Sequence, residues 1–412
     1  MKSIIFKIWK YPLISETFIT SQIITAINCG FDVKIIVEEV LPFEESKQIK
    51  LLEKHRIFDK IIIENYNIPK ARIYRVAKWL YLLIKNIRHL SKIISFYKYQ
   101  HSFSLTWLYQ LVFYKKHRNV SVFHVQYGTN KTPLDVLKKI DFIKSSLIVT
   151  FHGHDAFFPI NGIIPKDGYY DALFGYGDFV IANTPYLANE ITALGCPAQK
   201  LKIIPVGVDT TFFSSIPPKK KDDNITKLIT VGRLERVKGH EFFIEVAERL
   251  HLKGYQIEFV IVGEGREREA LSRLIVDKEL QKVVQLAGRK GPAEVREMLQ
   301  SSDIFLFTSV ATNEGRRETQ GLATLEAQAC GLPVVVFDSG GVKFTVKDGE
   351  TGFLVPEYDT EAMTSGIIEL IENDKLRKKM SKQAVQFVNE VYSQKGIDVT
   401  WKYLYESLSN GK

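Results

Sequence analysis

Residues 228–243 read LITVGRLERVKGHEFF. The apolar run predicts a buried strand that ends at Gly232 and Arg233, after which a short loop delivers Lys238 and Gly239 to the start of a helix. Free N–H groups and the dipole of a helix N-terminus favour an anion. Arg233 and Lys238 add two positive charges at that point, and arginine can grip two oxygens at once. The stretch therefore favours a phosphate site over its alternative, a loop with two solvated cations.

The same alternation of apolar runs and helical patterns continues along nearly the whole chain. Strands are predicted at 3–9, 32–39, 120–128, 146–153, 178–184, 227–233, 257–265, 283–289, 303–309 and 332–341. Strands that alternate with helices predict an α/β fold, in which helices cover both faces of doubly wound parallel sheets. Ligands of such sheets bind at the carboxyl ends of the strands, where this chain often places Gly, His or Asn.

A polar connector, SSIPPKKKDDNITK (214–227), interrupts this alternation. We therefore predict a Rossmann-like domain at 1–214, a linker at 215–226 and a second Rossmann-like domain at 227–390. The remaining residues, 391–412, predict a terminal helix without a further strand. The chain of 412 residues is long enough for two hydrophobic cores.

Composition predicts a globular protein of the cytoplasm. No apolar run reaches the ~18 residues that a membrane-spanning helix needs. Lys7 and Lys10 interrupt the first apolar residues, which favours a strand over a secretory leader. The three scattered cysteines, Cys29, Cys196 and Cys330, predict neither a disulfide framework nor a metal cluster, and they favour a reducing compartment.

Positive charge is concentrated in residues 71–118. This segment contains no Asp or Glu, eleven aromatic residues, and ten basic residues: Arg72, Arg75, Lys78, Lys85, Arg88, Lys92, Lys98, Lys115, Lys116 and Arg118. The net charge of the chain is +9, so all other residues together sum to about −1. A helical pattern of this composition suits an anionic membrane surface. A solvated helix face with its aromatic residues in the core is the equal alternative. Nucleic acid is less favoured because no binding motif accompanies the segment.

Two glutamates stand eight positions apart in RRETQGLATLEAQACG, residues 316–331. Eight positions on one straight helix are roughly 80° past two full turns, so Glu318 and Glu326 would not align. Gly321 lies between them, and good helix formers follow it, which puts Glu318 in a loop and Glu326 on a helix. The carboxylates could then accept hydrogen bonds from a ribose or a sugar, and N–H groups near Gln320 to Ala323 could bind phosphate. On spacing alone, a surface pair of charges is favoured.

Two further motifs follow predicted strands. IVGEGRERE (261–269) lacks the third glycine of a dinucleotide fingerprint, because Arg268 stands there, so it predicts a tight turn. FHGHD (151–155) places His152, His154 and Asp155 at the carboxyl end of a strand. These three residues do not favour a metal site, since no further His or Cys ligand accompanies them. Hydrogen-bonded structural histidines are the alternative.

Together these motifs resemble glycosyltransferase family 4. The resemblance rests on GRLERVKG, LAGRKGPAEVREMLQSSDIFLFTS, the E-x7-E pattern that ends in LEAQACGLPVVVFDSGG, and DGETGFLVPEYD. In the first half it rests on YPLISETFITSQI (11–23), FHGHD (151–155) and IIPVGVDTTFF (203–213). It covers nearly the whole chain, and the likeness is greatest to the branch that builds bacterial exopolysaccharide, colanic-acid-like polymers and lipopolysaccharide.

The resemblance implies a GT-B fold, with two Rossmann-like domains facing across a cleft and a final helix that returns to the N-terminal domain. It implies retaining transfer of a hexose from a nucleotide sugar, with UDP ahead of GDP, and no required metal. The residues agree on the metal, because the sequence contains no Asp-x-Asp motif, and Asp222-Asp223 lies in the connector with the wrong spacing. The acceptor would be a lipid-linked or cell-surface glycan on the cytoplasmic face of the membrane, with residues 71–118 as a peripheral anchor and no role for nucleic acid.

Site residues carry over by matching position. Arg233 and Lys238 would bind the donor diphosphate and stabilise the leaving group, and Glu326 would accept the ribose hydroxyls. Glu318 would face the transferred sugar, and His152 would contact that sugar or support the reacting groups. The remaining implied contacts are the backbone of Gly321, Leu322 and Ala323 with phosphate or hexose, and Arg289 and Val295 with the base.

This chain departs from the family pattern at two places. KYPLISETF replaces the usual Gly-Gly loop, so Ser15 and Glu16 become candidates for an acceptor or donor contact. Lys343-Phe344 replaces a usual Pro-Glu beside Gly340 and Gly341. Two other functions stay open: a nucleotide-sugar epimerase of the same fold, and an inactive scaffold that binds membrane or nucleic acid.

Overall fold

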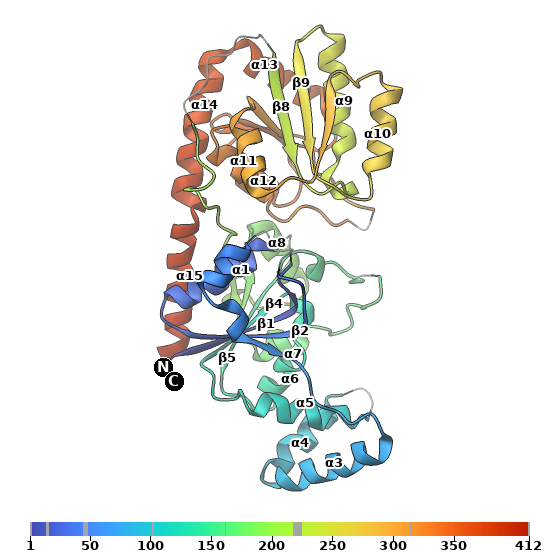
Figure 1. Cartoon of the computed structure of the whole chain (residues 1–412), viewed down its shortest axis with the longest axis vertical. Helices are drawn as coiled ribbons and strands as arrows, with labels where there is room; N and C mark the ends of the chain where they lie inside the picture. The colour runs from blue at the N-terminus through green and yellow to red at the C-terminus, as the bar shows by residue number, and fades with distance from the viewer. Residues whose placement is uncertain are drawn as a thin grey trace. The chain divides into compact units, whose positions relative to one another are not determined.

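The computed structural model describes residues 2–13, 16–43, 48–100, 103–160, 162–216, 225–313 and 315–410. The chain divides into two compact units (Figure 1). The first contains residues 1–182, 188–204 and 398–412, and the second contains residues 183–187 and 205–397. Residues 205–214, which we expected in the first domain, therefore group with the second unit. Most of the predicted linker lies outside the described residues.

The first unit is built on a seven-stranded sheet with the order β3-β2-β1-β4-β5-β6-β7. All its strand pairs are parallel. The strands are β1 (Ser3–Tyr11), β2 (Asp32–Val40), β3 (Ile61–Ile63), β4 (Val122–Gln126), β5 (Ser146–Thr150), β6 (Phe179–Ala182) and β7 (Leu201–Ile203). The helices are α1 (Thr17–Asn28), α2 (Ile49–Lys54), α3 (Arg72–Lys85), α4 (Leu90–Lys98), α5 (Thr106–Lys115), α6 (Leu134–Lys139), α7 (Asp171–Tyr176) and α8 (Pro185–Ala193).

The second unit has a six-stranded parallel sheet with the order β10-β9-β8-β11-β12-β13, in which the chain winds outward in both directions from β8. The strands are β8 (Thr226–Val231), β9 (Ile257–Val262), β10 (Val284–Gly288), β11 (Ile304–Phe307), β12 (Val334–Phe337) and β13 (Gly352–Val355). The helices are α9 (His240–Leu252), α10 (Arg268–Asp277), α11 (Pro292–Gln300), α12 (Leu322–Ala329), α13 (Thr360–Glu372), α14 (Asp374–Phe387) and α15 (Gln394–Asn410). Both sheets confirm the predicted doubly wound α/β class.

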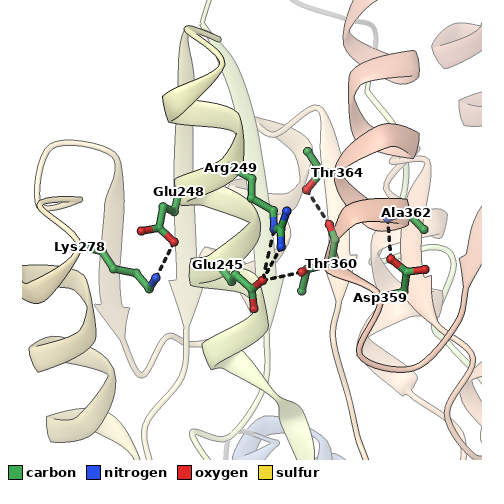
Figure 2. A network of polar contacts seen from close by, with 8 residues as sticks. All are labelled: Glu245, Glu248, Arg249, Lys278, Asp359, Thr360, Ala362 and Thr364. Atoms are coloured by element: carbon green, nitrogen blue, oxygen red, sulfur yellow. Dashed lines mark hydrogen bonds and ion pairs between the residues drawn. The ribbon is translucent and has the colours of Figure 1, made fainter.

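Helices cover both faces of the second sheet (Figure 1). On one face, apolar residues of α9, α10 and α13 pack on the strands, and on the other face those of α11 and α12 do so. Figure 2 shows the polar contacts that join three helices of the first of these faces. Glu245 on α9 accepts hydrogen bonds from Arg249 and from the Thr360 hydroxyl at the start of α13, the latter at 2.7 Å. Lys278, directly after α10, donates to Glu248 on α9 at 2.5 Å.

Residues 71–118 do not form one continuous surface. Helix α5 is largely buried, with Tyr109 and Tyr114 in the core. The Tyr114 hydroxyl donates to Glu64 at 2.5 Å, and the same carboxylate forms an ion pair with the buried Lys7 of β1. The core therefore takes up much of the aromatic content of this segment, whereas none of the residues of α3 is buried.

The last helix begins in one unit and ends in the other. After the π-helical turn Val388–Tyr392, α15 starts within the second unit, and the residues from Asp398 onward belong to the first unit. There Asp398 accepts a hydrogen bond from Thr25 at 2.6 Å, and the Tyr405 hydroxyl lies 2.9 Å from Nδ1 of the buried His124. The terminal segment thus returns to the first unit.

Candidate functional site

The predicted phosphate site lies at the carboxyl edge of the sheet in the second unit. Backbone hydrogen bonds continue past the strand ends there, from Gly232 N–H to the Val262 carbonyl at 3.0 Å and from Leu234 N–H to the Glu264 carbonyl at 2.9 Å. The Gly-x-Gly motif at 263–265 therefore lies against the loop that follows β8, and a Cβ at Gly263 would lie 1.8 Å from the Gly232 carbonyl oxygen.

An ion pair joins the two predicted halves of the site. Lys238 ends the short 3-10 helix Arg236–Lys238 before α9, and its ammonium nitrogen lies 2.5 Å from Oε2 of Glu318. Burial raises the pKa of the Glu318 carboxyl, but the charge and hydrogen bond of Lys238 outweigh this, so its pKa is below the ordinary value. Glu318 is thus ionised at neutral pH, and it can accept hydrogen bonds but cannot donate one.

Glu318 and Glu326 lie in different kinds of structure, as predicted. Gly321 has φ +83°, the left-handed region that favours glycine, and it caps the N-terminus of α12. Its N–H donates to Oε1 of Glu318 at 3.3 Å. The first N–H groups of α12, including those of Leu322 and Ala323, have no acceptor within the helix and are suited to an anion. Glu326 lies about one turn after Leu322 on α12 and is half-buried.

Residues that are distant in the sequence hold the Glu318 loop in place. The Thr184 hydroxyl donates to the Thr319 carbonyl at 2.7 Å, and the amide of Gln320 makes two hydrogen bonds with the backbone of Val206. Gly341 N–H donates to the Glu318 carbonyl at 2.8 Å. Sequence reasoning did not find these roles of the Thr184 and Gln320 side chains, because their partners are known only from the folded chain.

The close approach of the Gly340-Gly341 turn depends on a missing side chain. A Cβ at Gly341 would lie 1.8 Å from the Thr319 carbonyl oxygen. The two residues that depart from the family pattern leave this approach intact. Val342–Thr345 forms one 3-10 turn, and the Tyr392 hydroxyl donates to the Phe344 carbonyl at 2.5 Å.

The other predicted residues of this unit lie around the same sheet edge. Arg233 is exposed directly after β8, and its carbonyl lies 3.2 Å from Nε2 of His240. Burial lowers the pKa of His240 to about 4, so the ring is neutral. Arg289 is exposed after β10, and Val295 on α11 is partly buried against the core. Strand β9 separates β10 from β8, so Arg289 lies to one side of the Lys238–Glu318 pair.

His152 lies at the carboxyl end of β5 in the first unit. Its Nε2 is 2.9 Å from Oε1 of Gln126, whose amide nitrogen donates to Gln22 at 2.6 Å. Burial, with a smaller effect of His154, lowers the pKa of His152 to about 3. A neutral ring that faces an amide oxygen must carry its proton on Nε2. Gln126 thus fixes the tautomer of His152, and the sequence pattern gave no sign of this.

Asp155 holds the loop after His152 in place through backbone hydrogen bonds. This buried carboxylate accepts N–H hydrogen bonds from Gly128 at 2.7 Å, from Gly153 at 2.8 Å and from His152 at 3.0 Å. Its role is therefore structural. Within the described part of the chain, no cluster of three or more His, Cys, Asp or Glu residues is arranged to hold a metal ion.

Glu16 is connected to His152 through Tyr127. It accepts a hydrogen bond from the Tyr127 hydroxyl at 2.5 Å, and the Tyr127 ring lies 4.5 Å from the His152 ring between centroids. Tyr127 has φ +69°, a strained conformation that often accompanies functional sites. Ser15, the other predicted acceptor residue, lies outside the described residues.

A cavity of about 460 Å³ lies elsewhere in the second unit. It is lined by Arg236, Glu241, Phe242, Glu267 and Tyr358 among others, and none of the predicted site residues lines it. No helix in the described part of the chain combines the length and apolarity needed to cross a bilayer.

Comparison with known proteins supports the interpretation of these motifs. Residues 29–212 match the family model Glycosyltransferase Family 4, and residues 211–387 match Glycosyl transferases group 1. The chain is 27% identical over 405 residues to a putative colanic acid biosynthesis glycosyltransferase, WcaL, of Salmonella typhimurium, covering 95% of this chain and 97% of the relative. It is also 27% identical to the amylovoran biosynthesis glycosyltransferase AmsK of Erwinia amylovora, over 89% of each chain.

Solved structures share the fold over the full length. Anabaena Alr3699/HepE in complex with UDP has a TM-score of 0.72 at 16% identity, covering 99% of this chain and 100% of that one. A glycosyltransferase from Rickettsia africae has a TM-score of 0.73 at 20% identity, with 100% of both chains covered. With a family match in each half and two parallel Rossmann-like sheets, this chain is a glycosyltransferase of the GT-B fold and belongs to glycosyltransferase family 4.

Proposed function

We propose that the protein transfers a hexose from a UDP-sugar, with retention and without a metal, to a lipid-linked or cell-surface glycan in bacterial polysaccharide biosynthesis. The observation that carries this proposal is the Lys238–Glu318 ion pair beside the N-terminus of α12. It combines a fixed cation and helix N–H groups for a diphosphate with an ionised carboxylate for sugar hydroxyls. The relatives WcaL and AmsK are named for the biosynthesis of colanic acid and of amylovoran, and the HepE structure contains UDP.

In the proposed reaction, the bond between the anomeric carbon and the diphosphate oxygen breaks, and UDP leaves with the electron pair. The acceptor hydroxyl oxygen bonds to the anomeric carbon on the same face, and its proton passes to the leaving diphosphate. Lys238 and Arg233 supply positive charge where negative charge grows on the diphosphate. One such fixed donor contributes ~3 kcal/mol to the transition state.

The other residues have proposed binding roles. Glu326 accepts hydrogen bonds from the ribose hydroxyls, and Glu318 accepts them from hydroxyls of the transferred sugar. Arg289 and Val295 contact the base. In the first unit, the neutral His152 offers a hydrogen bond to substrate, and Glu16 helps to bind the acceptor. We place the enzyme at the inner face of the membrane, where lipid-linked acceptors are assembled.

A panel of UDP-sugars and GDP-sugars tests the donor. We expect one UDP-sugar to raise the melting temperature and to be hydrolysed slowly without acceptor, and we expect NMR of the released sugar to show the anomeric configuration of the donor. Conversion of the donor into an epimer without acceptor would instead support the epimerase. If no nucleotide sugar binds or reacts, the proposal is wrong.

A further inference from the structure

The outer face of α3 is apolar although it faces solvent in the described structure. Its residues are Ile73, Tyr74, Ala77, Leu80, Tyr81 and Ile84, and Ile87 continues it in the following 3-10 turn. Steps of four and three residues from 73 to 87 place these side chains on one side of the helix. Ile73 is 81% exposed and Ile84 is 71% exposed. A single exposed apolar residue is ordinary, but a continuous stripe marks an interaction surface.

The opposite side of α3 is fixed to the first unit. The Tyr109 hydroxyl on α5 donates to the Arg75 carbonyl at 2.6 Å, and Trp79 donates to the Tyr97 hydroxyl on α4 at 3.0 Å. Lys78 donates to the Asn67 carbonyl at 2.8 Å. Figure 1 shows α3 and α4 beyond α5, on the side away from the sheet of this unit. The helix therefore cannot turn its apolar face inward without breaking these bonds.

Cations border the outer face. Arg72, Lys85 and Arg88 are exposed on α3 and the following turn, and the Lys85 ammonium lies 3.4 Å from the Tyr81 hydroxyl. Other basic residues of the segment are engaged internally, such as Lys92 with the Ile140 carbonyl and Lys115 with Asn86. No acidic residue occurs between Glu64 and Asp135. The partner of this face must therefore be apolar, with negative charge at its border.

We propose that the outer face of α3 is a membrane-docking surface, which lies in the headgroup region of an anionic bilayer and inserts Ile73, Leu80, Ile84 and their neighbours below it. A helix with one apolar face and cations at its border binds membranes in this way. A second copy of the chain fits less well, because it would bring the same cations together. The proposal rests on the proposed function only for the lipid-linked acceptor, since docking itself needs no sugar transfer.

Flotation of the full-length protein with vesicles tests the surface. We expect binding to vesicles of phosphatidylcholine with phosphatidylglycerol, weaker binding to phosphatidylcholine alone, and loss of binding as salt rises. The double variant Ile73→Glu/Ile84→Glu should lower the partition coefficient at least ~10-fold, because it puts charge on the inserted face. Leu252→Glu is the matched control. This leucine is 80% exposed on α9 of the second unit, and its replacement should leave flotation unchanged.

A third variant separates charge from insertion. Arg72→Glu/Arg88→Glu should remove the preference for phosphatidylglycerol. UDP binding without vesicles should be the same in all variants, so a failure of the proposed donor would appear there and not in flotation. Equal flotation of the wild type and Ile73→Glu/Ile84→Glu would overturn the docking surface. The proposal would also be wrong if the wild type did not bind vesicles but formed a concentration-dependent dimer, and if Ile73→Glu/Ile84→Glu abolished that dimer.

Discussion

Replacement of Lys238 by alanine should destabilise the second unit through the charge that it leaves behind. The Lys238 and Glu318 side chains are only 16% and 19% exposed, so Glu318 would remain charged and largely desolvated. Removal of one partner of a fully buried pair costs ~3–5 kcal/mol. The residual exposure allows water to screen part of this, so we expect a loss of about 2 kcal/mol in the free energy of unfolding.

A second substitution shows whether the loss comes from the stranded charge. Glu318→Gln removes the charge, so Lys238→Ala/Glu318→Gln should cost less than the sum of the two single variants by at least ~1 kcal/mol. The folded pKa of Glu318 is lowered in the wild type, so its stabilising contribution is present above about pH 4.5 and is lost as the pH falls through the folded pKa. In Lys238→Ala, the pKa of Glu318 should rise, because burial, the largest effect on it, is then opposed only by the backbone hydrogen bonds of Gly321 and Gln320. The cost of the substitution should therefore shrink as the pH falls toward 5 and Glu318 takes up a proton.

The chain offers a built-in way to assign the effect to one unit. Its four tryptophans, Trp9, Trp79, Trp107 and Trp401, all belong to the first unit. Lys238→Ala should therefore shift the urea transition measured by far-UV circular dichroism more than the one measured by tryptophan fluorescence. In the proposed function it should also lower kcat ~100-fold, which corresponds to ~3 kcal/mol. If the cost of the double variant equals the sum of the two single costs within ~0.5 kcal/mol, Lys238 and Glu318 are not coupled, and the loss does not come from the charge left on Glu318.

Three further predictions concern other contacts. Gly341→Ala places a Cβ 1.8 Å from the Thr319 carbonyl oxygen, so it should lower stability by about 2 kcal/mol in urea unfolding and reduce transferase activity. Glu326→Ala should weaken UDP binding at least ~10-fold in a thermal-shift titration, whereas Glu361→Ala on α13 should not. Burial lowers the pKa of His124 to about 3 while the unfolded chain titrates near 6.5, so the unfolded state binds the extra proton as the pH falls below that value. His124→Gln should therefore remove an acid-induced loss of about 2 kcal/mol between pH 7 and 5, measured by urea unfolding.

The central strands could be predicted because they are buried on both faces and are therefore apolar over most of their length. The three strands that sequence reasoning missed, β3, β7 and β13, all lie at sheet edges. Two of them, Ile61–Ile63 and Leu201–Ile203, contain only three residues. An edge strand pairs on one side only, and a short one carries too little pattern to be distinguished from a loop.

The site could be predicted only as far as its motifs. Glu318 could be placed in a loop and Glu326 on a helix because Gly321 lies between them. A glycine in the left-handed region marks the point where the loop ends and the helix begins. What holds Glu318 in place could not be predicted, because Thr184 and Gln320 act through backbone groups that any residue carries. Gln126 gave no signal either, because its side chain meets that of His152 only in the folded chain, although it decides which nitrogen of His152 carries the proton.

The basic aromatic segment shows the difference between composition and position. Four of the eleven aromatic residues that first suggested a membrane are buried, as Phe96 and Tyr114 are, and the alternative of a core function holds for those four. The exposed apolar face instead consists mainly of aliphatic residues such as Ile73, Ile84 and Ile87, which composition alone would have assigned to a core. Only the hydrogen bonds that fix the other side of α3 show which side must face outward. The case for membrane docking therefore depends on how α3 is attached, and the aromatic count of the segment adds nothing to it.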